Sequence, residues 1–172
     1  TTNVAVGSAS LDANTTGANN VAVGYASLGS NTTASNNTAV GVGAMDSNTT
    51  GASNVALGAN ALDANTTASN NTAVGFDALT TNTTGFDNTA LGSNTLKTNT
   101  TGDYNTAVGK NALFSATTSN NNTAVGFNSL SDNTTGSRNV ALGFEAGAAN
   151  TLGFDSTFIG YRAGYSNTTG SG

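Results

Sequence analysis

A short apolar phrase, N-(V/T)-A-(V/L)-G, returns every 17 residues along the whole chain, separated by longer polar stretches. The unit that begins at Asn71 reads N-T-A-V-G-F-D-A-L-T-T-N-T-T-G-F-D, and its positions are numbered one to seventeen. Positions two to four are β-prone, and in an extended strand their side chains alternate between two faces. Because no 3.6-residue periodicity is present, the pattern predicts one short strand per unit rather than a helix.

Repeats of about this length are typical of solenoids, in which each unit is one coil that buries its apolar face only by stacking on its neighbours. The pattern predicts an all-β protein, a β-solenoid of ten 17-residue coils. We expect a single domain over residues 3–172, with atypical last two units, because position nine becomes glycine in both. The predicted units are 3–19, 20–36, 37–53, 54–70, 71–87, 88–104, 105–121, 122–138, 139–155 and 156–172.

The fourth position is aliphatic in every unit, and this predicts that it forms the core. The predicted core residues are Val6, Val23, Val40, Leu57, Val74, Leu91, Val108, Val125, Leu142 and Ile159. Position nine is Leu or Met in the first eight units and is expected to supply the second wall of the same core. The alanine at position three would then point outward.

So few buried aliphatic residues per coil make a thin core, which favours lateral association of chains. An outward stripe of alanine would let two flat faces approach closely. The predicted interface residues are Ala39, Ala56, Ala73, Ala90 and Ala107. We therefore expect a homo-oligomer, either a trimer or a filament.

The composition excludes several kinds of function. The chain has no His and no Cys, which removes the usual nucleophile–base pairs and the ligands of soft metals. Its net charge is -5, with four basic residues, so a nucleic-acid partner is not expected. No apolar run is long enough to insert into a membrane. These observations predict a protein that is not an enzyme and that needs no cofactor or metal.

The repeated phrases resemble the YadA-like head repeats of trimeric autotransporter adhesins, and similar repeats occur in phage tail-fibre proteins. The resemblance covers all ten units, from Asn3 to Gly172, although adhesin heads usually have units of about 14 or 15 residues. It implies a left-handed β-roll in which aliphatic strand residues such as Val4 and Val6 face the core and three chains associate. It also implies an extracellular, cell-surface or virion location and a structural or adhesive function, with surface glycans as partners.

Other patterns leave alternatives open. The N-T-T sequence is an N-glycosylation sequon and would allow a glycan-decorated filament, although N-T-T-G is also a turn sequence. These sequons are at Asn14, Asn31, Asn48, Asn65, Asn82, Asn99, Asn133 and Asn167. Ladders of their threonines would suit an ice-binding solenoid. Asp46 and Asp63 share position ten on adjacent coils, where they are expected to be solubilising carboxylates, with a glycosidase pair or a Ca²⁺ ligand pair as the alternatives.

Overall fold

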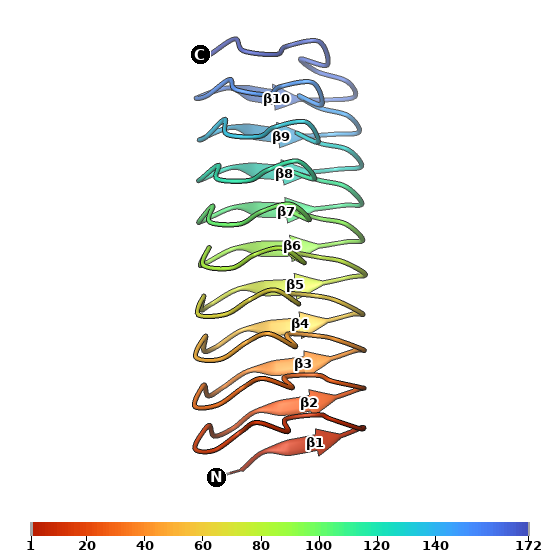
Figure 1. Ribbon diagram of the computed structural model, residues 1–172. Helices are drawn as coiled ribbons and strands as arrows, with labels where there is room; N and C mark the ends of the chain where they lie inside the picture. Colours follow the sequence, from red (N-terminus) through yellow and green to blue (C-terminus); the bar gives the residue numbers. More distant parts are fainter. Residues whose placement is uncertain (1, 172) are drawn as a thin grey trace.

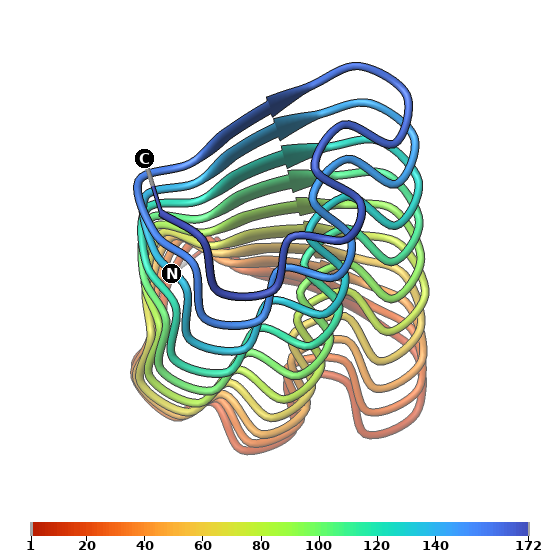
Figure 2. The same ribbon diagram turned by 90° about the horizontal axis from the view of Figure 1, so that it is seen from above.

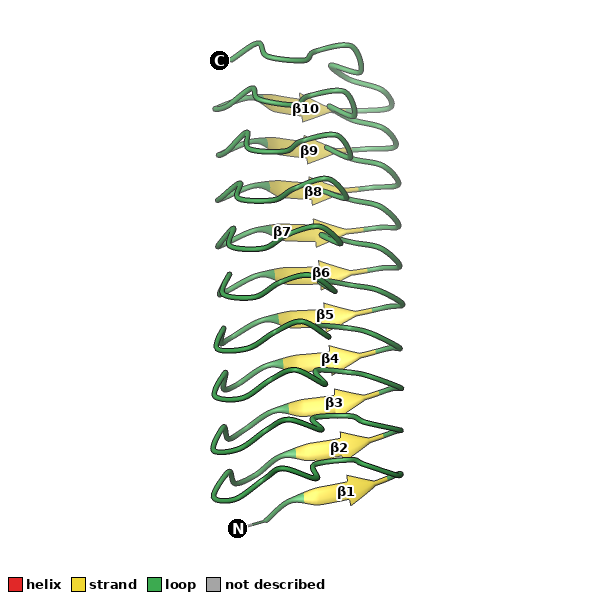
Figure 3. Ribbon diagram, viewed as in Figure 1, coloured by secondary structure: helices red, strands yellow, loops and turns green. Residues whose placement is uncertain are grey.

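A computed structural model describes residues 2–171 as one β-solenoid with a single three-residue strand in each coil (Figures 1 and 3). All ten strands lie side by side in chain order in one parallel sheet. The strands are β1 (Val4–Val6), β2 (Val21–Val23), β3 (Thr38–Val40), β4 (Val55–Leu57), β5 (Thr72–Val74), β6 (Thr89–Leu91), β7 (Thr106–Val108), β8 (Thr123–Val125), β9 (Val140–Leu142) and β10 (Thr157–Ile159). The predicted all-β solenoid of 17-residue coils is confirmed.

Each residue stacks on its counterpart 17 positions along the chain; Thr72, for example, pairs with Thr89. Backbone hydrogen bonds join the coils at the strand, where Thr72 N donates to Asn88 O at 2.8 Å. They also join the coils along the part of each coil that follows the strand and contains position nine, called here the return segment. There, Leu79 N donates to Thr95 O at 3.0 Å. Seen from above, the chain runs clockwise as it rises towards the viewer (Figure 2), which makes the coil left-handed.

The third and ninth positions face the interior of the coil. The sequence prediction, which placed the fourth position inside and the third position outside, is therefore wrong. Leu28, Met45 and the later ninth-position leucines are fully buried, which confirms that wall of the core. The opposite wall consists of the third-position alanines, which have no exposed surface from the second coil to the ninth. These are Ala22, Ala39, Ala56, Ala73, Ala90, Ala107, Ala124 and Ala141.

The fourth-position residues face outward instead, which corrects the predicted core. Val6 is 57% exposed, Leu91 47% and Ile159 66%. The others are also exposed or half-buried: Val23, Val40, Leu57, Val74, Val108, Val125 and Leu142. The physical reason is volume: the ninth-position leucine reaches across the narrow coil and leaves room for only a methyl group on the facing strand.

Two columns of asparagine run through the stack and fix the turns. In the strand-start column, at position one, Asn71 Nδ2 donates to Gly85 O at 2.8 Å while its Oδ1 accepts from Asn88 N at 2.9 Å. In the turn column, at position twelve, Asn82 Nδ2 donates both to Asn65 Oδ1 at 3.2 Å and to Gly85 O at 2.8 Å. Buried amides are tolerated here because neighbouring coils satisfy them.

The last two coils shift core volume from the ninth position to the third position of the tenth coil. Phe158 replaces alanine at position three, while Gly147 and Gly164 replace leucine at position nine. A methyl group added at Gly147 would lie 2.6 Å from Phe158 Cδ2, so the phenyl ring occupies the space that leucines fill elsewhere. One large side chain from the strand thus substitutes for two leucines from the return segment.

Candidate interaction surface

The outward side chains of the second and fourth positions form one continuous surface on β1 to β10, called here the strand face. It contains only Val, Leu, Ile and Thr, so it carries no charge along the whole rod. In the middle coils, Val40, Leu57, Leu91, Val125 and Leu142 keep between 37% and 47% of their surface exposed. Contiguous exposed apolar surface of this kind is typical of a contact site.

The size of the strand face is comparable with that of a stable interface. Ten coils with two partly exposed residues each present on the order of 1,000 Å², against about 800 Å² per partner in a standard protein–protein interface. The stacked strands extend for about 43 Å at a rise of about 4.8 Å per coil. The surface is therefore long and narrow, with its apolar fourth-position column continuous from end to end.

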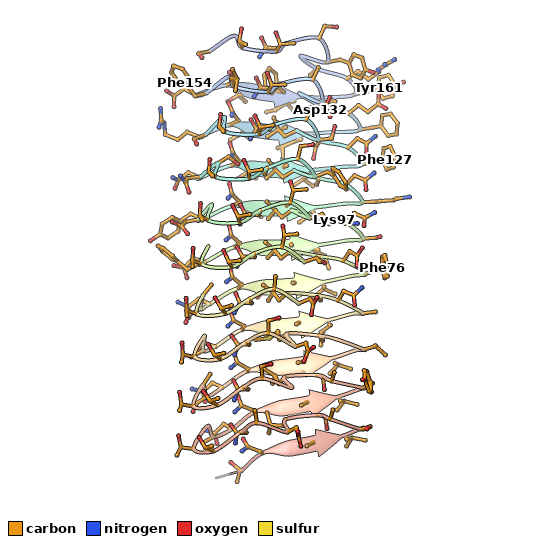
Figure 4. The ribbon with its side chains drawn as sticks, in the orientation of Figure 1. Phe76, Lys97, Phe127, Asp132, Phe154 and Tyr161 are labelled. Atoms are coloured by element: carbon orange, nitrogen blue, oxygen red, sulfur yellow. The ribbon has the colours of Figure 1, made fainter. Side chains whose placement is uncertain are left out.

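Aromatic side chains flank the strand face at both edges (Figure 4). Phe76, Phe127 and Tyr161 lie at the edge where the strands end, and Phe154 lies at the opposite edge. Phe127 and Phe144 stack with ring centroids 5.2 Å apart, and Tyr161 continues the stack at 5.5 Å. Because these rings use their faces on one another, a sugar ring cannot stack between them.

The predicted alanine interface is wrong, because Ala39, Ala56, Ala73, Ala90 and Ala107 are fully buried inside the coil. Their methyl groups pack against the leucine wall and cannot reach another chain. The property that suggested an interface, an apolar stripe in register on successive coils, belongs to the neighbouring fourth position. Sequence reasoning thus identified a stripe but placed it on the wrong side of the strand.

The sequon asparagines are structural residues of the turn column. Asn31, Asn48, Asn65, Asn82, Asn99 and Asn133 have no exposed surface, so they cannot carry glycans in this fold. The half-buried Asn14 and Asn167 also use Nδ2, which donates to Gly17 O and Gly170 O. The prediction of a glycan array along this corner is therefore wrong, and the turn interpretation of N-T-T-G holds.

The threonines of N-T-T differ in the use of their hydroxyl groups. Those at position thirteen donate to the next coil, as when Thr83 Oγ1 donates to Thr100 O at 3.0 Å. Those at position fourteen, such as Thr84 and Thr101, are exposed. A single column of exposed threonines gives a row rather than a two-dimensional lattice. Ice binding stays a prediction that a thermal-hysteresis measurement would test.

An acidic cluster lies on the return side of the coil. Asp77 is buried and bonded to Lys97 Nζ at 2.9 Å, and it accepts from Asn60 Nδ2 at 3.0 Å. Burial raises the pKa of the Asp63 carboxyl above 3.8, and the charges of Asp46 and Asp77 add to this effect. Within residues 2–171, no group of three or more carboxylates is arranged to hold a metal ion.

Asp63→Asn should raise the melting temperature at pH 7. With its folded-state pKa raised, Asp63 binds protons more tightly in the folded chain than in the unfolded chain. The stability that Asp63 contributes is therefore fully present below pH 3.8 and is lost as pH rises through its raised pKa. The gain from Asp63→Asn should shrink when melting is repeated near pH 3, and a gain of equal size at both pH values would contradict this account.

An open hollow lies near the C-terminal end of the return side, between Asp132 and Tyr165. Its floor includes the small Ala148 and Ala149. Glu145 at its rim is paired with Arg162 Nε at 3.0 Å. Asp132 and paired Glu145 supply the only carboxylates of the described lining, and this arrangement does not point to a reaction.

Comparison of the chain with protein-family models, with curated proteins and with solved structures gives no match. Residues 2–171 contain no helix that is long and apolar enough to cross a membrane. The strand face could have been found in the sequence from one signal. Phe158 appears together with Gly147 and Gly164, and such compensation is expected only if positions three and nine face the same interior.

Proposed function

We propose that this chain is a structural repeat segment of an extracellular fibre, a surface adhesin or a phage tail fibre, and that it acts as a homo-oligomeric rod assembled through the strand face. The observation that carries the proposal is the uncharged apolar fourth-position column, which is exposed or half-buried on every coil. A lone rod would hold this strip in water. A second copy of the chain offers a strip of equal length and equal polarity.

The geometry suits a structural role. Each coil bonds to its neighbours through backbone groups and through two asparagine columns, and these bonds favour a stiff rod. Packing of identical strand faces would place the flanking aromatic edges at the margins of the contact. The uncharged aliphatic column would then form the apolar centre that interfaces typically have.

Val74→Glu combined with Leu91→Glu tests the proposal, because it places two carboxylates in the centre of the strand face. The double substitution should weaken self-association at least 100-fold while the far-ultraviolet circular dichroism spectrum stays unchanged. Sedimentation velocity at micromolar concentration measures the assembly. The matched control is Thr84→Glu with Thr101→Glu, which adds the same charges to exposed positions on the same two coils.

The control pair should leave the assembly intact. A stable, folded monomer of the unmodified chain at micromolar concentration would contradict the proposal. Equal dissociation by both pairs would indicate a general effect of added charge, and it would remove the strand face as the contact.

A further inference from the structure

Lys110 is the one basic side chain that forms no salt bridge within residues 2–171. The other three basic residues each pair with a carboxylate of their own chain: Lys97 with Asp77, Arg138 with Asp155, and Arg162 with Glu145. Lys110 is exposed at position six of the seventh coil, at the edge of the strand face where the strands end. Its charge is therefore available to a partner outside the chain.

The opposite edge of the strand face, where the strands begin, carries carboxylates in the same part of the rod. Asp87 comes just before β6, and Asp103 comes just before β7. Neither forms a salt bridge with a cation of the described chain. Asp103 Oδ1 accepts from Phe86 N at 2.9 Å, which holds this carboxylate at the edge. The two edges thus carry charges of opposite sign.

Lys110 and Asp103 lie at nearly the same height on the rod, on opposite sides of β7. A coil of 17 residues rises by about 4.8 Å, so the seven residues between them rise by only about 2 Å. The strand separates the two side chains across the face, and no salt bridge joins them. A pair between these two charges therefore needs a second copy of the chain.

The direction of the two copies decides which edges meet. When copies are related by rotation about an axis along the rod, the edge where strands end meets the next copy's edge where strands begin, at the same height (Figure 2). When two aligned rods run in opposite directions, like edges meet, and β7 lies opposite β4. Lys110 would then face Ala59, and Asp103 would face Ala52, so neither charge would be matched.

We propose that copies of the chain lie parallel and in register, with Lys110 of each copy paired with Asp103 of the next. This inference rests on the proposed assembly through the strand face and adds its direction and register. The same arrangement brings together Tyr161 and Phe154, which are 74% and 49% exposed on opposite edges beside β10 (Figure 4). In the reversed arrangement, Tyr161 would face Ser8. Complementary charges across a contact fix its register and disfavour other alignments.

Carbodiimide coupling of the unmodified protein tests the pairing, because this reagent joins a lysine to a carboxylate only where the two are in contact. We expect covalent oligomers on a denaturing gel, and mass spectrometry of their peptides should find Lys110 linked to Asp103. Lys110→Arg keeps the charge but cannot be coupled, so it should assemble normally and lose the covalent oligomers. Lys97→Arg is the matched control, and it should keep them.

Charge reversal gives a second measurement. Lys110→Asp or Asp103→Lys alone should weaken self-association about 10-fold at low salt, because repulsion replaces attraction at every contact, and the two together should restore it. Asp132→Lys, on the return segment, should have no effect. An assembled protein without the Lys110–Asp103 link, or without rescue by the double reversal, would overturn the pairing and leave the strand-face contact standing. A monomeric protein would overturn both.

Discussion

Ala73→Asp should unfold the central coils, whereas Val74→Asp at the next residue should leave the chain folded. Ala73 has no exposed surface and is stacked between Ala56 and Ala90, so the substitution forces an oversized, unpaired carboxylate into the core. The expected loss is at least about 4 kcal/mol for a buried unpaired charge. The Val74 side chain is partly exposed on the strand face, and its substitution should cost about 1 kcal/mol or less within the coil.

Thermal melting followed by circular dichroism separates the two variants. It should be done at low protein concentration, because Val74→Asp is also expected to weaken assembly. The opposite order of stabilities, with Val74→Asp unfolded and Ala73→Asp intact, would contradict this account. It would mean that the fourth-position side chains, and not the third-position alanines, face the interior.

Phe158→Ala should release the last two coils, at a cost of about 2–3 kcal/mol. The ring fills the space beside Gly147 and Gly164, and truncation leaves a cavity there. The loss is smaller than for a completely buried phenylalanine because Phe158 is only partly buried. Amide hydrogen exchange should accelerate in β9 and β10 while β4 to β6 stay protected.

Adding Gly147→Leu and Gly164→Leu to Phe158→Ala should restore protection, because it re-creates the alanine and leucine pair of the other coils. Leucine can adopt the required backbone, since Leu113 and Leu130 have φ of 52° and 49° at the equivalent position. Phe154→Ala removes an exposed ring from the same coils and should have little effect. If the triple variant exchanged as fast as Phe158→Ala alone, the volume exchange would not explain these two coils.

The period, the coil length and the ninth-position wall of the core could be predicted from the sequence, because they depend on spacing and on large apolar residues such as Leu62 and Leu79. The phase of the strand could not be predicted by placing the largest aliphatic side chains inside. That rule assigned Val74 to the core, although the leucine of the facing segment already fills the interior. Complementary volume across the coil decided the outcome in favour of Ala73.

The stacking of asparagines in ladders follows from the repeat, but the burial of the asparagine columns was missed for a related reason. Asn65 or Asn82 taken alone has the composition of a surface turn, and its N-T-T context suggests a glycan acceptor. Burial becomes favourable only when the same amide lies directly above and below, which is a property of the stack.

The in-register stacking has a genetic consequence. Because the internal coils meet their neighbours through nearly the same alanine, leucine and asparagine contacts, a stretch of 17 residues could be duplicated or deleted by unequal recombination without a new core. Each such event would change the rod by about 4.8 Å. A deletion of one residue would instead misalign the columns. The length of the rod can therefore vary between related genes in whole coils, independently of the chemistry of the strand face.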